Sequence, residues 1–526
     1  MSFDELHTLN TVASLLCSYR LEKEPFQAVI PSLSSIVLKS SQDSDYRKVL
    51  AENKEVWHTV DQCAKLKDYH NDFGENHELR FWYLRTFRGL VMLARNLSVS
   101  NNETPQTAML LDKFVKAFNV LSRNSQYEEM DLNLFKSITE FSCNVTTKSV
   151  IFDRTSIDDL ARFLCYPIGN NERRDLISPH TMLLRNLAGN GDFVYYFLKT
   201  QQAPAILYDY LIQTVSQEQT EIPQVIDGAQ STGDELSTLG ALVVSIFWTI
   251  CSHESFAPYL QRVQESNEAH FLEYIKLLRL VITSSQSWDN FQLTGIMTWC
   301  FRLLEETASD VKDYFKNNNE DEDHAKLLHD RLIIVLDMLT NLTQYEHVRK
   351  FMNFYKGLEL LVDLLHLFQE KLLRLNVMRL TGQNSSSLKV TNSNGVQISD
   401  SAVIASRFDS DIGKIKATNF PECKLLIIEI LCFLVYKDRE VQDKMRKLQG
   451  LEAVLSNCVI DDNDPFIKER SIMCIKMLLE DNAENQKIVA QLETKKPVDD
   501  DLLSSAGYKV NVGKDGKIQI APPAKQ

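Results

Sequence analysis

The chain has 526 residues, a formal net charge of −14, 17 glycines and 13 prolines. Glycine and proline together are about half as common as in an average protein, which argues against an all-β fold, a collagen-like chain and broad disorder. The acidic balance argues against a general nucleic-acid-binding protein, which needs a basic surface, and against adsorption to anionic membranes. We therefore expect a soluble globular protein with no nucleic-acid partner.

The chain shows no targeting or membrane signal. Its first residues carry Asp4 and Glu5 and lack the basic region of a secretory signal peptide. The longest apolar run, 239–251, is shorter than the ~20 residues of a membrane-spanning helix, and Glu429 interrupts the run 425–435. The ten cysteines include no CxxC pair, as expected of buried thiols in a reducing compartment. We expect no membrane partner and a cytoplasmic location.

Helical patterns that close on an asparagine recur along the chain. They are ARNLSVSNN at Asn96, SCNVTTKS at Asn144, LLRNLAGNG at Asn186 and MLTNLTQYE at Asn341. The first three asparagines are 48 and 42 residues apart, and two further copies, LCFLVYKDREVQ and KMLLEDNAENQ, are 44 apart. A period of about 40–47 residues is typical of armadillo and HEAT repeats. The predicted fold is an all-α, armadillo/HEAT-like superhelical repeat solenoid.

Shifts in composition divide the array. Residues 216–235 and 381–418 are polar, and the second is rich in Ser, Asn and Asp, which predicts a flexible insertion. The predicted organisation is N-terminal armadillo-like repeats at 1–215, central helical repeats at 236–380, the insertion at 381–418, C-terminal repeats at 419–494 and a tail at 495–526.

One C-terminal unit shows the punctuation of a three-helix repeat. Asp438 is a predicted N-cap, and Gly450 is expected to close the next helix in the left-handed conformation. Asp464 is expected to cap a third helix with Pro465 at its first position, and Asn482 to cap a fourth. A long–short–long order of helices follows from these signals.

The tail changes from helical to strand-like patterning. The stretch YKVNVGKDGKIQI alternates apolar and polar residues about the turn signal Asp515-Gly516. The apolar positions that mark the predicted β-hairpin are Val510, Val512, Ile518 and Ile520. Because an isolated hairpin is marginal in water, we expect it to dock on the C-terminal repeats.

No catalytic or metal-binding pattern is present. The sequence contains no GxGxxG, GxxxxGK[ST], HExxH or GxSxG. His324 and His329 lie beside acidic residues and are typical of a solvated loop that runs into a helix. Met473, Cys474 and Met477 share one apolar helix and are expected in the core, so no copper site is predicted. We expect no enzyme activity, no metal and no cofactor.

The repeated asparagines allow two interpretations. An amide offers both a donor and an acceptor, so Asn96, Asn144, Asn186 and Asn341 could line a concave groove and bind the backbone of an extended peptide. Alternatively, each amide satisfies backbone groups near its own helix end. Both interpretations remain open from the sequence.

The C-terminal region is similar to a known family. The stretches VLSNCVIDDNDPFIKE, 454–469, and LLEDNAENQKIV, 478–489, resemble the C-terminal domain of the ataxin-10 family, and DLLSSAGYKVNVGKDGKIQI resembles its end. A yeast relative is named a copper transport protein. This sequence departs from that name, because it has no membrane span and no copper-binding motif. The residues that carry the resemblance are Asp461, Asn463, Pro465, Phe466, Asn482, Asn485 and Gln486.

This resemblance implies a cytoplasmic armadillo-like scaffold without catalysis. It would bind other proteins and act in the regulation of cytokinesis and the cell cycle. A peptide or cargo receptor that uses the asparagines is the alternative, and association of the chain with itself stays open.

Overall fold

The computed structural model describes most of the chain. The described residues are 3–18, 21–64, 73, 76–100, 105–122, 129–147, 154–168, 174–216, 238–284, 287–317, 321–379, 386–492, 509–512 and 518–521. Only the backbone is described at 3, 105–108, 174–178, 238, 377–379, 386–387, 492, 509–512 and 518–521. The polar segment predicted to separate the first two groups of repeats, 216–235, lies almost wholly outside these residues.

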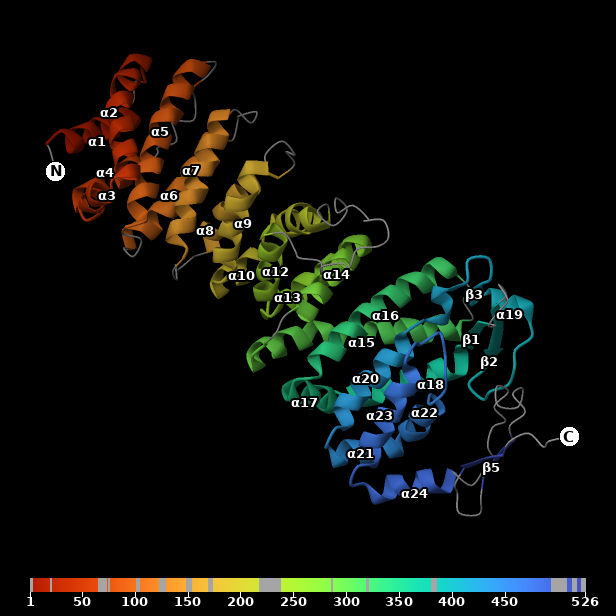
Figure 1. Ribbon diagram of the computed structural model, residues 1–526. Coiled ribbons are helices and arrows are strands. Elements are labelled where there is room, and N and C mark those ends of the chain that lie inside the picture. Colours follow the sequence, from red (N-terminus) through yellow and green to blue (C-terminus); the bar gives the residue numbers. More distant parts are fainter. Residues whose placement is uncertain are drawn as a thin grey trace. The chain divides into compact units, whose positions relative to one another are not determined.

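Contacts divide the chain into two compact units, Met1–Ile296 and Met297–Gln526. Unit 1 is helical throughout its described part (Figure 1). Its elements are α1 (Phe3–Leu16), α2 (Lys23–Gln42), α3 (Ser44–Ala51), α4 (Lys54–Cys63), α5 (His77–Ser98), α6 (Pro105–Leu121), α7 (Glu129–Val145), α8 (Arg154–Leu164), α9 (Arg174–Ala188), α10 (Gly191–Phe197), the π-helix η2 (Ala205–Ile212), α12 (Thr238–Cys251), α13 (Phe256–Ser266) and α14 (Glu268–Ser284).

Helix α15 (Asn290–Lys316) begins in unit 1 and ends in unit 2. The other helices of unit 2 are α16 (Glu322–Leu342), α17 (Glu346–Phe354), α18 (Gly357–Lys371), α19 (Ser401–Ala405), the 3-10 helix η3 (Ala417–Asn419), α20 (Cys423–Val435), α21 (Arg439–Lys447), α22 (Gly450–Ser456), α23 (Ile467–Leu479) and α24 (Ala483–Leu492). Its strands are β1 (Arg374–Arg379), β2 (Ser386–Thr391), β3 (Phe408–Asp409), β4 (Lys414–Ile415), β5 (Lys509–Val512) and β6 (Ile518–Ala521).

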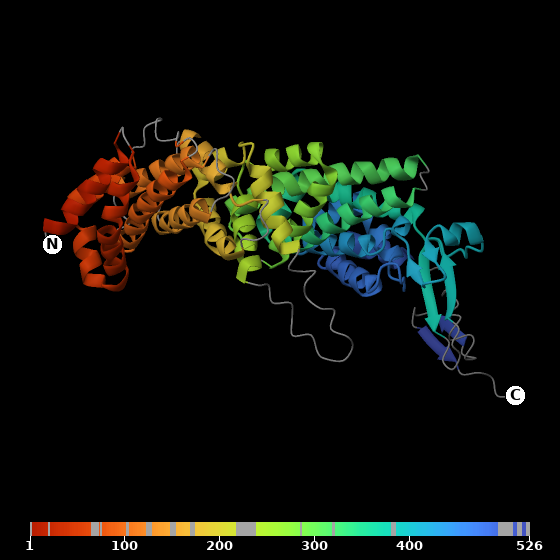
Figure 2. The same ribbon diagram turned by 90° about the horizontal axis from the view of Figure 1, so that it is seen from above.

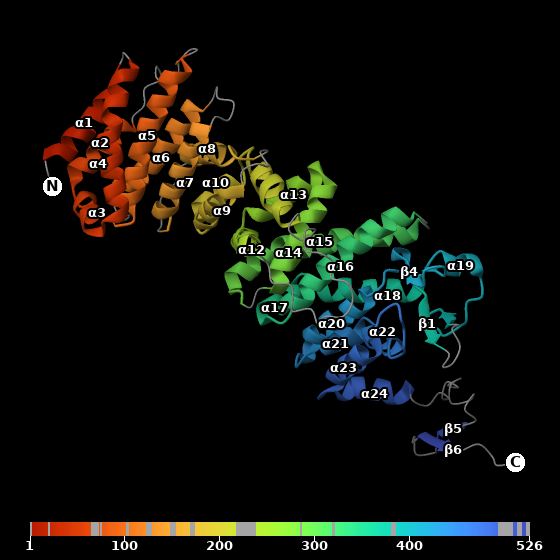
Figure 3. The same cartoon turned by 45° about the horizontal axis from the view of Figure 1, so that its top comes forward.

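In unit 1, one helix from each repeat joins a row in which α2, α5, α7, α9 and α12 pack side by side in this order (Figures 1 and 3). Helices α6 and α8 pack behind this row and close the core with aromatic rings. Phe114 of α6 lies between Phe87 of α5 and Phe141 of α7, with ring centroids 5.9 and 5.2 Å away. Each repeat therefore buries its apolar face against its neighbours, as repeat arrays require.

Unit 2 repeats its backbone conformation as well as its helices. Left-handed residues precede α20 and α23, at Glu422 (φ 65°) and Phe466 (φ 68°), and follow them, at Lys437 (φ 54°) and Asp481 (φ 53°). Both pairs are 44 residues apart, the spacing that the sequence repeats. Helices α16, α20 and α23 pack in order as the row of this unit. The predicted all-α, armadillo/HEAT-like repeat fold is confirmed.

Helix punctuation in this unit was predicted in part. Asp438 and Asn482 cap α21 and α24, and their side chains accept from the N–H groups of Val441 and Asn485. At α22, however, the left-handed residue is Gln449 (φ 58°). Gly450 begins the helix instead, where a Cβ would lie 2.7 Å from the Cε of Met445. The glycine permits a close approach between helices, and the predicted helix closure at Gly450 was wrong.

The third cap also needs correction. Helix α23 begins at Ile467 rather than at Pro465, and Asp464 does not cap it. The Oδ1 of Asp464 instead accepts from the N–H of Leu425, in the preceding row helix. Burial of a charged network, described below, overrides the local capping signal.

The segment predicted as a flexible insertion is folded from 386 to 418. Strand β2 pairs antiparallel with β1, and β3 pairs with β4. Leu373, Leu375, Val390 and Phe408 are buried together, and Leu388, Ile398, Ile404 and Ile415 pack against them. The composition misled because the apolar residues are sparse, and because two of the four buried ones precede the segment. Figure 2 shows β1 and β2 projecting as a ribbon from the helices of unit 2.

The predicted C-terminal hairpin is confirmed as a strand pair. Val510 pairs with Ile520 and Val512 with Ile518, in antiparallel register. The turn at 515–516 and all side chains of the tail lie outside the described residues, so the docking of the hairpin on the repeats stays a prediction.

The sequence predicts no membrane-spanning helix and mostly buried cysteines. No single helix in the described ranges is long and apolar enough to cross a membrane; α12 and α13 pass such a test only as a pair bent by 108°. All ten cysteines are free, and six of them are buried.

The folded insertion generates a stability prediction. Phe408→Ala removes a ring that is 7% exposed and should cost about 3 kcal/mol, because it leaves a cavity among the packed apolar side chains of this small core. Hydrogen exchange should then lose protection across β1, β2 and residues 398–418. Ile412→Ala, at a position 70% exposed, is the matched control and should change nothing. Equal protection in both variants would contradict packing of the insertion.

Candidate functional site

The repeated asparagines of unit 1 join one row helix to the next. The Nδ2 of Asn96 on α5 donates to the carbonyl of Val37 (3.1 Å) and the hydroxyl of Ser40 (2.9 Å) on α2. Ser40 lies three residues after Val37, and its hydroxyl also donates to the Val37 carbonyl (2.8 Å). One amide therefore satisfies two groups on the neighbouring helix.

The same arrangement recurs twice along the row. Asn144 of α7 donates to the Arg95 carbonyl (3.2 Å) and the Ser98 hydroxyl (3.0 Å) of α5. Asn186 of α9 donates to the carbonyl of Cys143 (3.2 Å) and the hydroxyl of Thr146 (3.4 Å) at the end of α7. The residue before each asparagine supplies the carbonyl for the next repeat, so the amides form a continuous relay, here called the asparagine row.

Asn341, the fourth predicted position, lies in unit 2 and behaves differently. Its Nδ2 donates to the Asp337 carbonyl (2.9 Å) of its own helix. The structure therefore brings three of the four predicted residues into one row. Within that row Asn96 is buried, whereas Asn144 and Asn186 are half-buried. Binding of an extended peptide by these asparagines is not tested by this geometry and stays a prediction.

A pocket of about 410 Å³ opens beside the asparagine row, between α2 and α5. We call it the arginine pocket. Its α2 wall is mainly apolar, with Ile30, Leu33, Val37 and Leu38. Its α5 wall is basic, with Arg85, Arg88 and Arg95 around Gly89, where a Cβ would lie 2.7 Å from the Cδ2 of Leu33. The pocket thus combines an apolar side with a cationic side.

The three arginines differ in how their charge is compensated. Arg95 pairs with Glu140 of α7, and its Nε and Nη2 donate to the Oδ1 of Asn96. Within the described part of the chain, Arg85 and Arg88 form no ion pair. Burial and the nearby charge of Arg95 lower the pKa of Arg88, partly opposed by Glu140. Arg88 donates to the Ser137 hydroxyl (3.3 Å), and Arg85 lies 5.3 Å from the ring centroid of Trp82.

Sequence reasoning missed these arginines, although a signal was present. From Leu79 to Ser98 the chain has four arginines and no acidic residue, and 25–42 has no acidic residue either, in a sequence with 71 of them. The two helices that carry these stretches are separated in the sequence by α3, α4 and residues 64–76, so only packing shows that they share a pocket.

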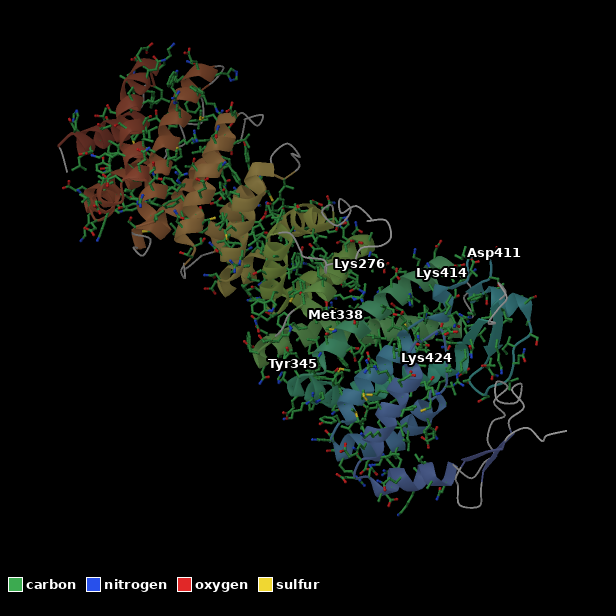
Figure 4. All side chains as sticks on the ribbon, viewed as in Figure 1. Lys276, Met338, Tyr345, Asp411, Lys414 and Lys424 are labelled. Atoms are coloured by element: carbon green, nitrogen blue, oxygen red, sulfur yellow. The ribbon has the colours of Figure 1, made fainter. Side chains whose placement is uncertain are left out.

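In unit 2, the family-like segment surrounds a buried charge network. Lys424 is 3% exposed, and its Nζ lies 2.7 Å from the Oδ2 of Asp461 and 3.1 Å from the Oδ2 of Asp464. Burial would lower the pKa of Lys424, but the two carboxylates raise it above its ordinary value. Burial raises the pKa of Asp464, and the nearby charge of Asp461 adds to this, while Lys424 partly opposes it. Figure 4 shows Lys424 among the helices of this unit.

The network also holds the folded insertion against the repeats. Asp461 accepts from the N–H of Leu375 (3.1 Å), and Asn419 donates to the Leu373 carbonyl (2.9 Å). Asn419 donates in addition to the Oδ1 of Asn463 (2.7 Å). These bonds join the start of β1, η3 and the loop before α23 in one buried junction.

The remaining family-like residues serve the next repeat. Asn482 donates to the side chains of Gln442 (3.2 Å) and Asp443 (3.1 Å) on α21. Asn485 donates to the Leu478 carbonyl and Gln486 to the Leu479 carbonyl, both at 2.8 Å. Pro465 and Phe466 differ, since both are exposed and Phe466 is 75% exposed. Most of the motif is therefore structural.

A second pocket, of about 330 Å³, lies among η2, α13 and α14. The ring of Tyr208 stacks on His270 with centroids 3.7 Å apart, and the hydroxyls of Tyr259 and Tyr274 are 2.8 Å apart. Burial raises the pKa of Tyr259 to about 12. These hydroxyls stay neutral near pH 7, which suits a structural hydrogen bond. A general base would instead need a pKa close to 7.

The histidines and sulfur-containing residues that were considered for metal binding mostly have structural contacts. His329 shares a hydrogen bond of 3.0 Å with the Pro421 carbonyl, and the His324 ring packs on Tyr314. Within the described ranges, no group of three or more His, Cys, Asp or Glu side chains could hold a metal ion. Cys474 is buried as expected, but Met473 is 37% exposed and is not a core residue.

The asparagine row generates a mutational prediction. Asn144→Ala should destabilise the contact of α5 with α7 by about 1–2 kcal/mol, because it leaves the Arg95 carbonyl and Ser98 hydroxyl with one partner fewer. Hydrogen exchange at 90–98 and 138–146 measures this. A double-mutant cycle with Ser98→Ala should show coupling. Asn341→Ala, whose amide bonds within its own helix, should change stability by less than about 0.5 kcal/mol; additivity of the first pair would contradict the row.

The charge network generates a second prediction. Lys424→Met leaves two buried carboxylates without their cation and should cost about 3–5 kcal/mol. Thermal unfolding of unit 2 and exchange across β1 and α23 should both report the loss. Lys447→Met removes an exposed lysine from α21 and is the matched control. A Lys424→Met protein as stable as this control would show that the network does not hold the junction.

The C-terminal part of the chain matches a known protein domain, and nearly the whole chain matches known proteins. Residues 423–521 match the spinocerebellar ataxia type 10 protein domain. An ataxin-10 homolog of Candida glabrata is 38% identical over 519 residues, covering 97% of this chain and 98% of that protein. The ataxin-10 homolog of Saccharomyces cerevisiae is 32% identical over 541 residues, covering 98% and 95%.

Among solved structures, importin beta shares 11% identity, with 93% of this chain and 66% of that chain covered and a TM-score of 0.21. A structure concerning a phosphorylation switch in the interaction between cadherin and β-catenin shares 9% identity over 90% and 84%, with a TM-score of 0.31. The near-complete match to the homologs of two yeasts decides the assignment. The chain belongs to the ataxin-10 family.

Proposed function

We propose that this chain is a non-enzymatic protein-interaction scaffold that works in the cytoplasm and takes part in the regulation of cytokinesis. Membership of the ataxin-10 family supports the scaffold class. The observation that carries the proposal is the asparagine row, which holds successive helices in register. Leu38 of α2 and Arg85 of α5 are both exposed and line the same pocket on adjacent helices of this row, which gives a partner a surface that spans more than one repeat.

Such a surface suits binding rather than catalysis. Repeat arrays present long surfaces on which each repeat contributes a few side chains, and affinity adds up over several of them. The two described pockets are lined by side chains that hold helices together or carry fixed charge. The arginines of the first carry fixed positive charge, and burial raises the pKa of the Tyr259 and Tyr274 hydroxyls in the second.

Depletion in dividing cells tests the cellular role. Cells without the protein should accumulate two or more nuclei because division fails late, and the wild-type chain should restore single nuclei. A fluorescent fusion should fill the cytoplasm. Purified chain mixed with two of its binding proteins should form a ternary complex in light scattering. Normal division in depleted cells would contradict the cytokinesis role, and mutually exclusive binding would contradict a scaffold.

A second candidate is a receptor for an extended peptide bound along Asn96, Asn144 and Asn186. The observation in its favour is that these amides lie in register on adjacent helices, as a peptide backbone would require. Each Nδ2 already donates to the neighbouring helix, and the Oδ1 of Asn96 already accepts from Arg95, so such a peptide would donate its own N–H groups mainly to the amide oxygens of Asn144 and Asn186. Selected peptides whose backbone N-methylation has no effect on affinity would rule this candidate out.

A further inference from the structure

We infer that the arginine pocket is a docking site for an acidic segment of a partner protein that carries a large apolar side chain between its carboxylates. This inference rests on the proposed protein-interaction role and names the chemistry of the partner. It starts from the pocket's two unlike walls, which a purely apolar or a purely charged segment would match only on one side.

The apolar wall asks for an anchor. Leu38 is 57% exposed on α2, and Ile30, Leu33 and Val37 lie beside it at the pocket. A volume of about 410 Å³ holds a leucine or phenylalanine side chain with part of its backbone. Gly89 keeps the space open, because a side chain there would collide with Leu33.

The basic wall asks for carboxylates. Arg85 and Arg88 lie one helical turn apart on α5, and Arg95 lies two turns further along the same stripe. Ten residues of helix rise about 15 Å, which about five residues of extended peptide span. Glu140 already compensates Arg95, so the attraction is concentrated at Arg85 and Arg88.

The charge surroundings give the site its sign. Neither α2 after Pro25 nor α5 after Leu79 carries an acidic residue, although the chain has a net charge of −14. Burial of Arg88 and its repulsion by Arg95 lower its pKa, and the attraction of an incoming carboxylate would offset both effects. A protein segment is favoured over nucleic acid, because the net negative charge of the chain repels a polyanion at longer range.

Peptide selection on the full-length chain tests the site. A phage library of random peptides of about 12 residues is selected on the wild type and counter-selected on the double variant Arg85→Glu/Arg88→Glu. Fluorescein-labelled versions of the enriched peptides are then titrated by anisotropy. We expect Asp and Glu around one large apolar residue, at least about a tenfold rise in Kd for the double variant, and weaker binding at higher salt.

Two controls separate the pocket from general charge and from folding. Lys48→Glu/Lys54→Glu makes the same change in net charge on two exposed lysines of α3 and α4, and should leave the Kd unchanged. Arg85→Gln/Arg88→Gln removes the cations without adding acids and should still weaken binding several-fold. Its circular dichroism and melting temperature should match those of the wild type.

The contrary results are distinct. Enriched peptides without acidic residues, an unchanged Kd in both arginine variants, equal loss in the lysine control, or no enrichment would each overturn the inference. Displacement of the peptides by oligo(dT) with higher affinity would assign the pocket to nucleic acid instead. Peptides that bind independently of the arginines would still agree with a scaffold, whereas normal division after depletion would reject the cytokinesis role and leave the pocket in place.

Discussion

Register between repeats in unit 1 depends on one side-chain amide at each of three successive junctions, α2 with α5, α5 with α7 and α7 with α9. Packed apolar faces alone leave neighbouring helices free to slide by a turn, because hydrophobic contact is not directional. A hydrogen bond from Asn144 to the Arg95 carbonyl and Ser98 hydroxyl has one acceptable position, and the same holds for Asn96 and Asn186. The aromatic core supplies most of the cohesion, and the asparagine row decides how the helices line up.

In unit 2, a buried network of charged side chains fixes the position of neighbouring elements. Lys424, Asp461 and Asp464 are nearly inaccessible to water, so their mutual geometry is strongly constrained once they are buried. The two carboxylates also accept hydrogen bonds from backbone groups of β1 and α20 and from Asn463. The family-like sequence around 461–464 is therefore explained by a structural junction, while exposed Phe466 beside it remains available for contact.

These two devices have consequences for binding. A helix row held in register turns single exposed residues into a surface of fixed spacing, which is what recognition of a partner segment requires. The arginine pocket lies beside the first amide of the row, and Arg95 takes part in both, since its carbonyl accepts from Asn144 and its guanidinium faces Glu140. Stability of the repeat junction and charge of the pocket are thus linked through one residue.

The sequence alone determined the class of fold and the repeat period, because helical periodicity and the 44-residue recurrence can be read from the order of residues without knowledge of packing. The motifs at 454–469 and 478–489 indicated the family by resemblance. It also determined the caps at Asp438 and Asn482 and the presence of the C-terminal hairpin. Tertiary structure decided what depends on distant residues meeting. Phe408 and Val390 form a core in a polar segment only because Leu373 and Leu375 pack against them. Asp464 does not cap α23 because its carboxylate pairs with the buried Lys424. The arginine pocket joins α2 to α5 across an intervening pair of helices, and no local pattern in either helix specifies that contact.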